Sequence, residues 1–224
     1  MTQSVSDTIE RVPIEEALKV GWDGMKKHFW LLLGMTVTTQ VPYMICHAIA
    51  SMTAKQQPFV SLALSLVGMV YLLVCTLGIL RATLKIVNQD SIAFSDLFSM
   101  VSRTFNYLGA TILFLIALTL GFICLIVPGV ILAIKLQFYP YFIADKNMGP
   151  IAALKASWAV TRDVKLRLFL LYLVCGVVNT IGLLCLILGI IPASMVVMIA
   201  QTFVYRRLVE TKPETADIPI QSLV

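Results

Sequence analysis

The stretch YLGATILFLIALTLGFICLIVPGVILAIKLQFYPYFIA, residues 107–144, decides the fold class of this chain. Lys135 is its single charged residue, and the pair Pro128-Gly129 interrupts it near the middle. About 20 apolar residues of helix cross the hydrocarbon core of a bilayer, and a Pro-Gly pair stops one helix and permits a tight reversal. The stretch therefore predicts two transmembrane helices joined as a hairpin.

Apolar runs of this kind recur along the whole chain of 224 residues. They make 59% of the chain hydrophobic, and 13% of it is charged, whereas soluble domains are roughly 25% charged. We predict an all-α, polytopic membrane protein with six transmembrane helices in three hairpins. The expected spans are residues 29–51, 59–80, 107–127, 129–144, 168–189 and 190–205, so that residues 1–209 form one membrane domain and residues 210–224 a flexible cytoplasmic tail.

Each predicted hairpin follows a segment whose apolar residues recur at helical spacing while charged residues occupy the other face. This pattern is typical of a helix that lies in the headgroup plane. The three apolar stripes are Ile14, Leu18, Trp22, Met25 and Phe29; Phe94, Leu97, Phe98, Val101 and Phe105; and Ile151, Leu154, Trp158 and Val164. The pattern predicts a repeat of one interfacial helix followed by one hairpin, which occurs three times in the same orientation. The alternative is that leucine-rich helices look alike by chance.

Lysine and arginine residues gather on alternate sides of the predicted spans. They are frequent before the first span, after the second and fourth spans and in the tail, whereas the loop after the first span carries Lys55 alone. Because basic residues are retained on the cytoplasmic face, both termini and the two longer loops are expected in the cytoplasm. The net charge of +5 then reflects contact with anionic lipid headgroups, and we expect no nucleic-acid partner.

Residues that carry chemistry are scarce in the predicted spans. No Asp or Glu occurs in any of them, although proton relays in membranes usually need such groups. The sequence contains no zinc-protease motif, no nucleophile elbow and no paired carboxylates, and its five cysteines are scattered through apolar stretches. We expect a protein that is not an enzyme and that binds no metal and no cofactor.

Lys135 is the one charged residue inside a predicted span, roughly 9 Å below the outer end of the fourth span at 1.5 Å of rise per residue. Its stem can snorkel to the outer headgroups, or its ammonium group can hold a lipid phosphate or an anionic solute between helices. Gln40, Asn179 and Gln201 are further polar residues of the spans. They either hydrogen-bond neighbouring helices as packing contacts or line a polar cavity together with Lys135.

Residues 125–162 resemble the YciC-like family of bacterial inner-membrane proteins, which is related to the membrane domain of glycerophosphoryl diester phosphodiesterases. The resemblance rests on Ile126-Val127-Pro128-Gly129-Val130-Ile131, on Asp145-Lys146, and on Gly149, Ala152, Lys155, Ser157 and Thr161. It implies a multi-pass protein of the bacterial inner membrane without an established activity. Within the motif we expect Pro128, Gly129, Asp145, Lys146, Gly149 and Ser157 to build the fold and not to bind a ligand.

The sequence favours a non-catalytic scaffold or a lipid-responsive component of the membrane. The alternative is a small transporter or permease with a polar intramembrane site around Lys135. An enzyme that acts on lipid headgroups is the least favoured class, because the spans lack carboxylates and no extramembrane segment exceeds about 30 residues. We expect membrane lipids as partners, and the sequence leaves open a membrane protein partner and the oligomeric state.

Overall fold

The computed structural model describes residues 12–184 and 189–211, and within these residues it is helical without any β-strand. Its elements are α2 (Ile14–Thr53), α3 (Pro58–Val87), the short 3-10 helices η1 (Phe94–Phe98) and η2 (Val101–Arg103), α4 (Thr104–Cys124), α5 (Ile126–Leu136), α6 (Tyr139–Lys146), α7 (Pro150–Thr161), α8 (Lys165–Leu184) and α9 (Ile190–Thr211). The predicted all-α class is confirmed for this part of the chain. The predicted flexible tail lies outside the described residues from residue 212 onward.

Among the described residues, five helical stretches are long and apolar enough to cross a membrane. They are Ile14–Thr53, Pro58–Val87, Phe94–Cys124, Ile126–Lys146 and Lys165–Leu184. The sixth predicted span corresponds to α9, which is not one of these five. α9 carries Arg206 and Arg207, and 11 of its 22 residues are buried, so it contributes more to the interior of the protein than to an apolar surface.

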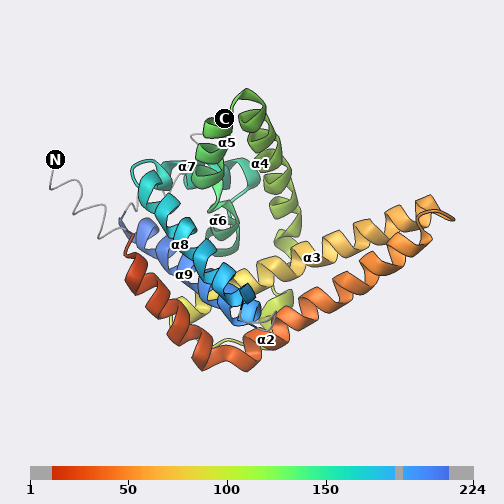
Figure 1. The fold of residues 1–224 in the computed structure, drawn as a ribbon, viewed down its shortest axis with the longest axis horizontal. Helices are drawn as coiled ribbons and strands as arrows, with labels where there is room; N and C mark the ends of the chain where they lie inside the picture. Colours follow the sequence, from red (N-terminus) through yellow and green to blue (C-terminus); the bar gives the residue numbers. More distant parts are fainter. Residues whose placement is uncertain (1–11, 185–188, 212–224) are drawn as a thin grey trace.

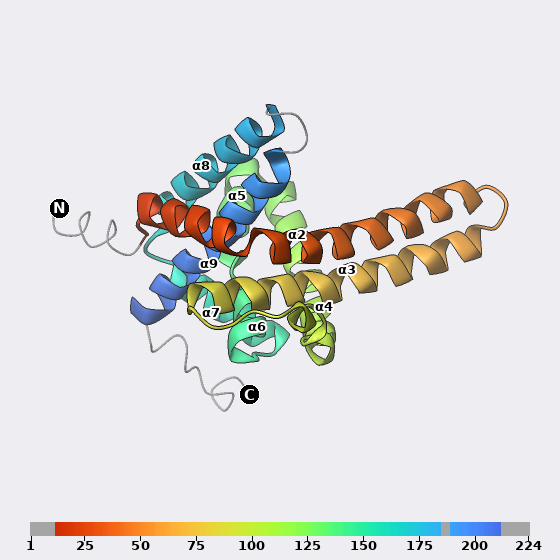
Figure 2. The same ribbon diagram turned by 90° about the horizontal axis from the view of Figure 1, so that it is seen from below.

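α2 and α3 lie side by side, and their joined ends project from the rest of the molecule as a two-helix arm (Figures 1 and 2). α2 is interrupted at His28, whose φ of −117° and ψ of 19° are not helical. This interruption falls where the first predicted interfacial helix meets the first predicted span. Apolar side chains of the arm are widely exposed, with Met44 at 65% and Phe59 at 86%, so the arm presents a surface that suits lipid better than water.

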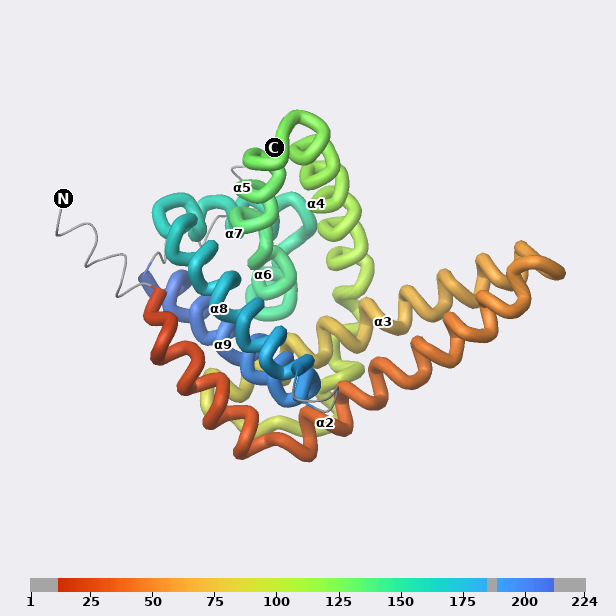
Figure 3. Tube along the Cα trace, in the orientation of Figure 1, coloured from red at the N-terminus to blue at the C-terminus, as the bar shows by residue number. Residues whose placement is uncertain are grey.

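The α4–α5 pair leaves the body of the molecule in a different direction from the α2–α3 arm (Figures 1 and 3). α8 lies beside α9 across the body, below the α4–α5 pair in the same view (Figure 1). The three helix pairs are therefore not arranged as three equivalent copies, as the expected repeat would require. Contacts with neighbouring elements, which differ for each pair, set these directions.

The reversal between the third and fourth predicted spans is not at Pro128-Gly129. It lies at Leu125, whose φ of −174° and ψ of 154° are extended, and both Pro128 and Gly129 belong to the first turn of α5. Proline is tolerated there, because the N–H that it lacks would have no partner inside the helix. Gly129 instead permits a close approach of α4 and α5, since a Cβ at this position would lie 2.7 Å from the ring of Phe122.

The fourth predicted span, residues 129–144, is not one continuous helix. α5 ends at Leu136, and α6 begins at Tyr139 after Phe138, whose φ of −89° and ψ of 2° leave the helical path. Pro140 stands in the first turn of α6, where its fixed φ favours the start of a helix. The candidate crossing Ile126–Lys146 is therefore a broken helix.

The second predicted interfacial helix, around Phe94 to Phe105, is also not continuous. It consists of η1 and η2, and α4 begins only at Thr104. Asp96 explains the short first turn, because its carboxylate accepts hydrogen bonds from the Ala93 N–H at 2.9 Å and from Lys85 Nζ at 2.7 Å. Such local bonds from Asp compete with the helical pattern.

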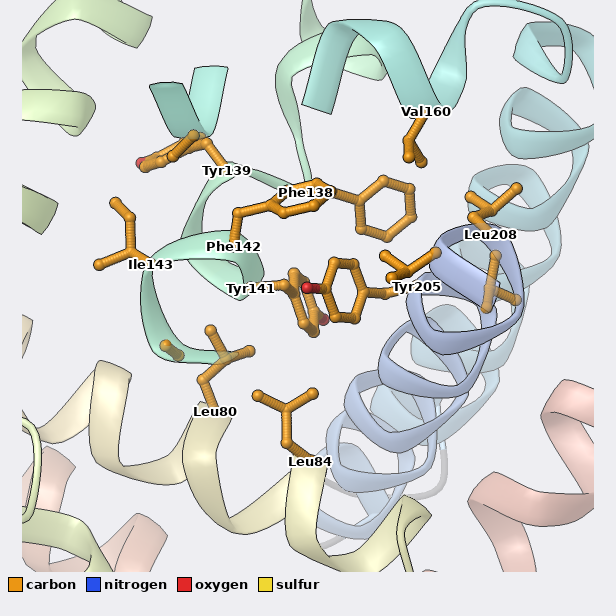
Figure 4. Packing of buried hydrophobic residues seen from close by; sticks show 14 of the residues in the cluster. Leu80, Leu84, Phe138, Tyr139, Tyr141, Phe142, Ile143, Val160, Tyr205 and Leu208 are labelled. Carbon is orange, nitrogen blue, oxygen red and sulfur yellow. The ribbon is translucent and has the colours of Figure 1, made fainter. Parts of the chain in front are cut away.

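The core of the body is rich in aromatic rings, and α6 supplies several of them (Figure 4). The ring of Tyr205 on α9 lies 5.0 Å from the ring of Tyr141 and 5.1 Å from that of Phe142, centroid to centroid. Leu84 from α3 and Val160 from α7 belong to the same cluster. The break before α6 thus lets this short helix turn its rings toward α9.

Gly78 on α3 offers a test of how tightly the η1 segment packs. A Cβ at Gly78 would overlap the backbone carbonyl of Leu97, whereas a Cβ at Gly176 on α8 meets no atom within 4 Å. We expect Gly78→Ala to lower the free energy of unfolding by about 1–3 kcal/mol, as overpacked cores do. Gly176→Ala, the matched control in a helix interior, should leave it unchanged or raise it by up to about 1 kcal/mol. The thermal unfolding midpoint of the purified protein in detergent measures both, and equal midpoints would contradict the prediction.

Candidate functional site

The break between α5 and α6 leaves backbone groups without partners in their own helices, and α7 supplies the missing partners. Ser157 donates a hydrogen bond to the Lys135 carbonyl at 2.8 Å and accepts one from the Phe138 N–H at 3.1 Å. The Thr161 hydroxyl lies 3.1 Å from the same Lys135 carbonyl and shares its single proton with the Ser157 carbonyl of its own helix at 2.8 Å. Ser157 was expected to build the fold and not to bind a ligand, and in the structure its hydroxyl bonds the backbone on both sides of a helix break.

α7 has two faces of different chemistry. Its inward face carries small or branched residues that are buried: Ala153, Ala156, Ser157, Val160 and Thr161. Its outward face carries Ile151, Lys155, Trp158 and Arg162, all of them exposed. These four positions recur at helical spacing, so they form one stripe along the helix.

Lys135 lies against the outward face of α7. Its side chain is only 8% exposed, and its Nζ lies 3.4 Å from the centre of the Trp158 ring. Such cation–π contacts contribute about 0.5–2 kcal/mol. Arg162 and Lys165 lie near enough for their charges to act on Lys135, so three cations lie near one another beside this end of α7.

The position of Lys135 differs from the expected one near the outer end of a span. It stands at the end of α5 that is distant from the reversal at Leu125, next to α7 and the first residue of α8. At 1.5 Å per residue, the ten positions from Leu125 place it about 15 Å from the reversal. Lys135 therefore neighbours the loop for which the charge distribution predicts a cytoplasmic location.

An apolar groove adjoins the same helix. It has a volume of about 560 Å³ between the first half of α4 and the first half of α7. Gly109 and Ile112 line it from α4, while Pro150, Ile151 and Lys155 line it from the α7 side. An apolar groove with one cation at its edge fits an amphiphile with an anionic group.

The remaining motif residues hold α6 in place. Asp145 forms an ion pair with Arg206 at 3.0 Å and accepts a hydrogen bond from the Tyr205 hydroxyl at 3.1 Å. Lys146 is exposed as the last residue of α6, and Gly149 precedes α7 with extended backbone angles. These positions tie α6 to α9 and start α7.

The other polar residues proposed from the sequence lie on separate elements. Gln40 lines a cavity between α2, α3 and α9, and the described residues that line it include none of Lys135, Asn179 and Gln201. Asn179 is half-buried on α8, and its Oδ1 has no hydrogen-bond partner among the described residues. Gln201 is half-buried on α9. The structure gathers Trp158, Arg162 and Lys165 around Lys135 instead, and the helical spacing of Lys155, Trp158 and Arg162 was the sequence signal that pointed to them.

Ser157→Ala tests the support that α7 gives to the helix break. The substitution leaves the buried Phe138 N–H without its acceptor and removes one of two donors to the Lys135 carbonyl, so we expect a loss of about 1–3 kcal/mol in stability. Ser65→Ala is the matched control, because Ser65 is exposed and its hydroxyl bonds only the Ser61 carbonyl of its own helix. Thermal unfolding in detergent compares the two, and an equal midpoint for both variants would refute the assigned task.

Comparison with known proteins gives a family but no relative of known activity. No curated protein matches the chain, and no solved structure matches it either. One family model, described as a domain of unknown function, matches residues 51–224. The matched residues include α3 to α9, and with them the α5–α6 break, the outward face of α7 and the groove beside it. The chain belongs to the family of this domain of unknown function, DUF7847.

Proposed function

We propose that the chain is a non-catalytic integral protein of a bacterial inner membrane that responds to anionic lipid at the outward face of α7. The observation that supports the proposal is the contact of Lys135 with Trp158, with Arg162 and Lys165 near enough for their charges to act on Lys135 and with Lys155 one turn from Trp158. A tryptophan beside several cations is typical of the boundary between apolar chains and headgroups.

The chemistry of a phospholipid matches both parts of the site. Its phosphate meets the cations, each of which contributes about 1 kcal/mol to the attraction of an anionic surface. One acyl chain has a place in the apolar groove of 560 Å³ beside Ile151 and Pro150. Lys155 lines this groove and also belongs to the outward stripe of α7, so one residue joins the apolar part to the cationic part.

The membrane arrangement is part of the same proposal. We infer six crossings in three hairpins, with three interfacial segments and with both termini in the cytoplasm. Support comes from the five helical stretches that could cross a membrane, to which α9, packed against α8, would add the sixth. The exposed apolar side chains of the arm and the rule that basic residues stay on the cytoplasmic face support it further. The kinship with the YciC-like family is proposed on the motif between residues 125 and 162.

A transporter is the second hypothesis. The four polar residues on which it was based do not share one cavity, since Gln40 lines a space without Lys135, Asn179 or Gln201. Lys135 instead rests on Trp158 at 3.4 Å. A fixed cation on an indole ring near other cations favours recognition of an anionic headgroup over passage of a solute.

Fluorescence of Trp158 tests the lipid proposal directly. The chain has three tryptophans, so Trp22→Phe with Trp30→Phe leaves Trp158 as the reporter. Reconstitution with brominated phosphatidylglycerol or brominated phosphatidylcholine then measures which lipid sits beside the ring. We expect a several-fold preference for the anionic lipid, and Lys155→Gln or Arg162→Gln should each reduce it about fivefold, the equivalent of about 1 kcal/mol per charge.

Two controls separate a local site from the general effect of charge. Lys55→Gln removes the same charge at the turn of the arm, away from α7, and should leave the preference at Trp158 unchanged. A chain that keeps only Trp30, which is 81% exposed, reports on bulk lipid and should show little preference. Equal quenching by both lipids at Trp158 would contradict the proposal.

Labelling of cysteines tests the number of crossings. α5 has 11 residues and spans about 16 Å, which is half of a hydrocarbon core of about 30 Å, so the α4–α5 pair crosses fully only if α6 continues the path. Cys124 is exposed beside the reversal. In a chain whose single cysteine is Cys124, an impermeant maleimide added outside the cell should label that cysteine. A chain whose single cysteine comes from Lys55→Cys should also be labelled, and one whose single cysteine comes from Lys155→Cys should not. Protection of Cys124 with labelling of Lys55→Cys would favour a re-entrant pair.

A further inference from the structure

A second cavity lies between α2, α3 and α9, on elements that the lipid proposal does not use. Its volume is about 270 Å³, slightly below the range of about 300–1,000 Å³ of small-molecule sites. Among the described residues that line it, none is charged and six are polar: Thr36, Thr39, Gln40, Thr76, Thr83 and Ser194. What such a cavity can bind depends on which acceptors the hydroxyl protons already bond.

Every one of these hydroxyl groups donates its proton to a carbonyl of its own helix. Thr36 donates to Leu32 at 2.8 Å, and Thr39 donates to Met35 at 2.8 Å. The remaining donations are Thr76 to Leu72 at 2.7 Å, Thr83 to Leu80 at 2.8 Å and Ser194 to Ile191 at 2.7 Å. A hydroxyl whose single proton is used in this way can offer only its lone pairs to a ligand.

Thr83 has less to offer than the others, because its oxygen lies 3.0 Å from the Thr202 hydroxyl, which shares its one proton between Thr83 and the Met198 carbonyl at 2.8 Å. The free acceptors are therefore the hydroxyl oxygens of Thr36, Thr39, Thr76 and Ser194. Gln40, an exposed residue, also lines the cavity and brings an amide oxygen as a further acceptor. The cavity is thus lined by neutral oxygen acceptors from three helices. Among its described lining residues, the amide nitrogen of Gln40 is the one side-chain donor left.

We propose that this cavity binds a primary ammonium group. An ammonium has three donors and no acceptor. It can therefore donate to the hydroxyl oxygens, and it has no acceptor that would need a donor from the cavity. An alcohol or an amide would bring acceptors for which the described lining offers one side-chain donor, the amide nitrogen of the exposed Gln40. Rings of neutral oxygen dipoles are known to replace the hydration shell of a monovalent cation in channels, so the absence of a carboxylate from the described lining does not prevent cation binding.

The ammonium group could belong to a free amine or to an ethanolamine headgroup of a lipid, and the test separates these sources. The full-length protein in detergent is heated with methylammonium chloride, tetramethylammonium chloride or potassium chloride at constant ionic strength. We expect methylammonium to raise the unfolding midpoint. Tetramethylammonium has the same charge but no N–H donor, so it should leave the midpoint unchanged. Potassium, which neutral oxygens also coordinate, should raise the midpoint less than methylammonium does. If free ethanolamine raises the unfolding midpoint as methylammonium does, the ligand is a soluble amine. If the midpoint rises only with phosphatidylethanolamine in nanodiscs, the ligand is the lipid.

Thr39→Val and Thr76→Val each remove one acceptor while keeping the shape of the side chain. A hydrogen bond to a charged group contributes about 1.5–3 kcal/mol, so each variant should bind methylammonium at least tenfold more weakly. Thr180→Val on α8 is the matched control, because its exposed hydroxyl also bonds a carbonyl of its own helix, that of Gly176 at 2.8 Å. Gln40→Leu, at an exposed position, provides a further variant if a buried one does not fold.

Three results would overturn the proposal. The first is that neither methylammonium nor phosphatidylethanolamine changes the unfolding midpoint of the protein without substitutions. The second is stabilisation by tetramethylammonium or potassium equal to that by methylammonium, because the cavity would then not select N–H donors. The third is undiminished binding in both threonine variants. Each is independent of the lipid proposal, since none of the changed residues lies on α7.

Discussion

The pair of hydrogen bonds that Ser157 makes across the α5–α6 break is the constraint on which the rest of the site depends. Inside a bilayer an unpaired backbone group costs several kcal/mol, so a broken helix persists only where neighbouring side chains satisfy it. Ser157 and Thr161 meet this need for the Lys135 carbonyl, and Ser157 meets it for the Phe138 N–H. They can do so only if the small-residue face of α7 turns inward, and this orientation turns Lys155, Trp158 and Arg162 outward. The cationic face is thus a geometric consequence of repairing the break.

The same break determines the interior of the body. Once the chain leaves α5, the short helix α6 is free to direct its rings at Tyr205 of α9, and the Asp145–Arg206 ion pair fixes its far end. An ion pair with little exposure needs further hydrogen bonds to its remaining lone pairs, and the Tyr205 hydroxyl supplies one to Asp145. α9 therefore carries an ionic and aromatic inner surface. This explains why it is less apolar than a helix that faces lipid, although periodicity alone predicted a sixth span there.

Composition and periodicity predicted the helical class and the approximate extent of the long apolar helices, because both depend on the solvent around the chain. They failed at Pro128-Gly129, since proline is compatible with the first turn of a helix as well as with a turn between helices, and the sequence does not distinguish the two. They also failed at Gln137-Phe138, where the apolar pattern continues without a stop and the break is stabilised by Ser157 and Thr161, across separations of 19 to 26 positions. Lys135 was recognised as unusual, but its neighbours depend on how α7 docks, which is a tertiary contact. The spacing of Lys155, Trp158 and Arg162 was visible in the sequence, but Trp158 was assigned to an apolar stripe with Ile151, Leu154 and Val164, and the charged residues were assigned to the opposite face.

The hydroxyl cavity and the cationic face are connected by packed side chains. Thr202 bonds Thr83 at the cavity, and one turn later on α9 Tyr205 packs against Phe138, with ring centroids 6.1 Å apart. Phe138 is the residue whose N–H is held by Ser157, and Trp158 follows Ser157 directly on α7. Contiguous packing of this kind is one physical route by which energy passes between two sites, and a measured change in one site on occupation of the other is what establishes coupling. On this route, a shift of α9 at the cavity would first alter the contacts that stabilise the helix break. The positions of Trp158 and Lys135 would change only as a result, so coupling between the two sites would pass through the break.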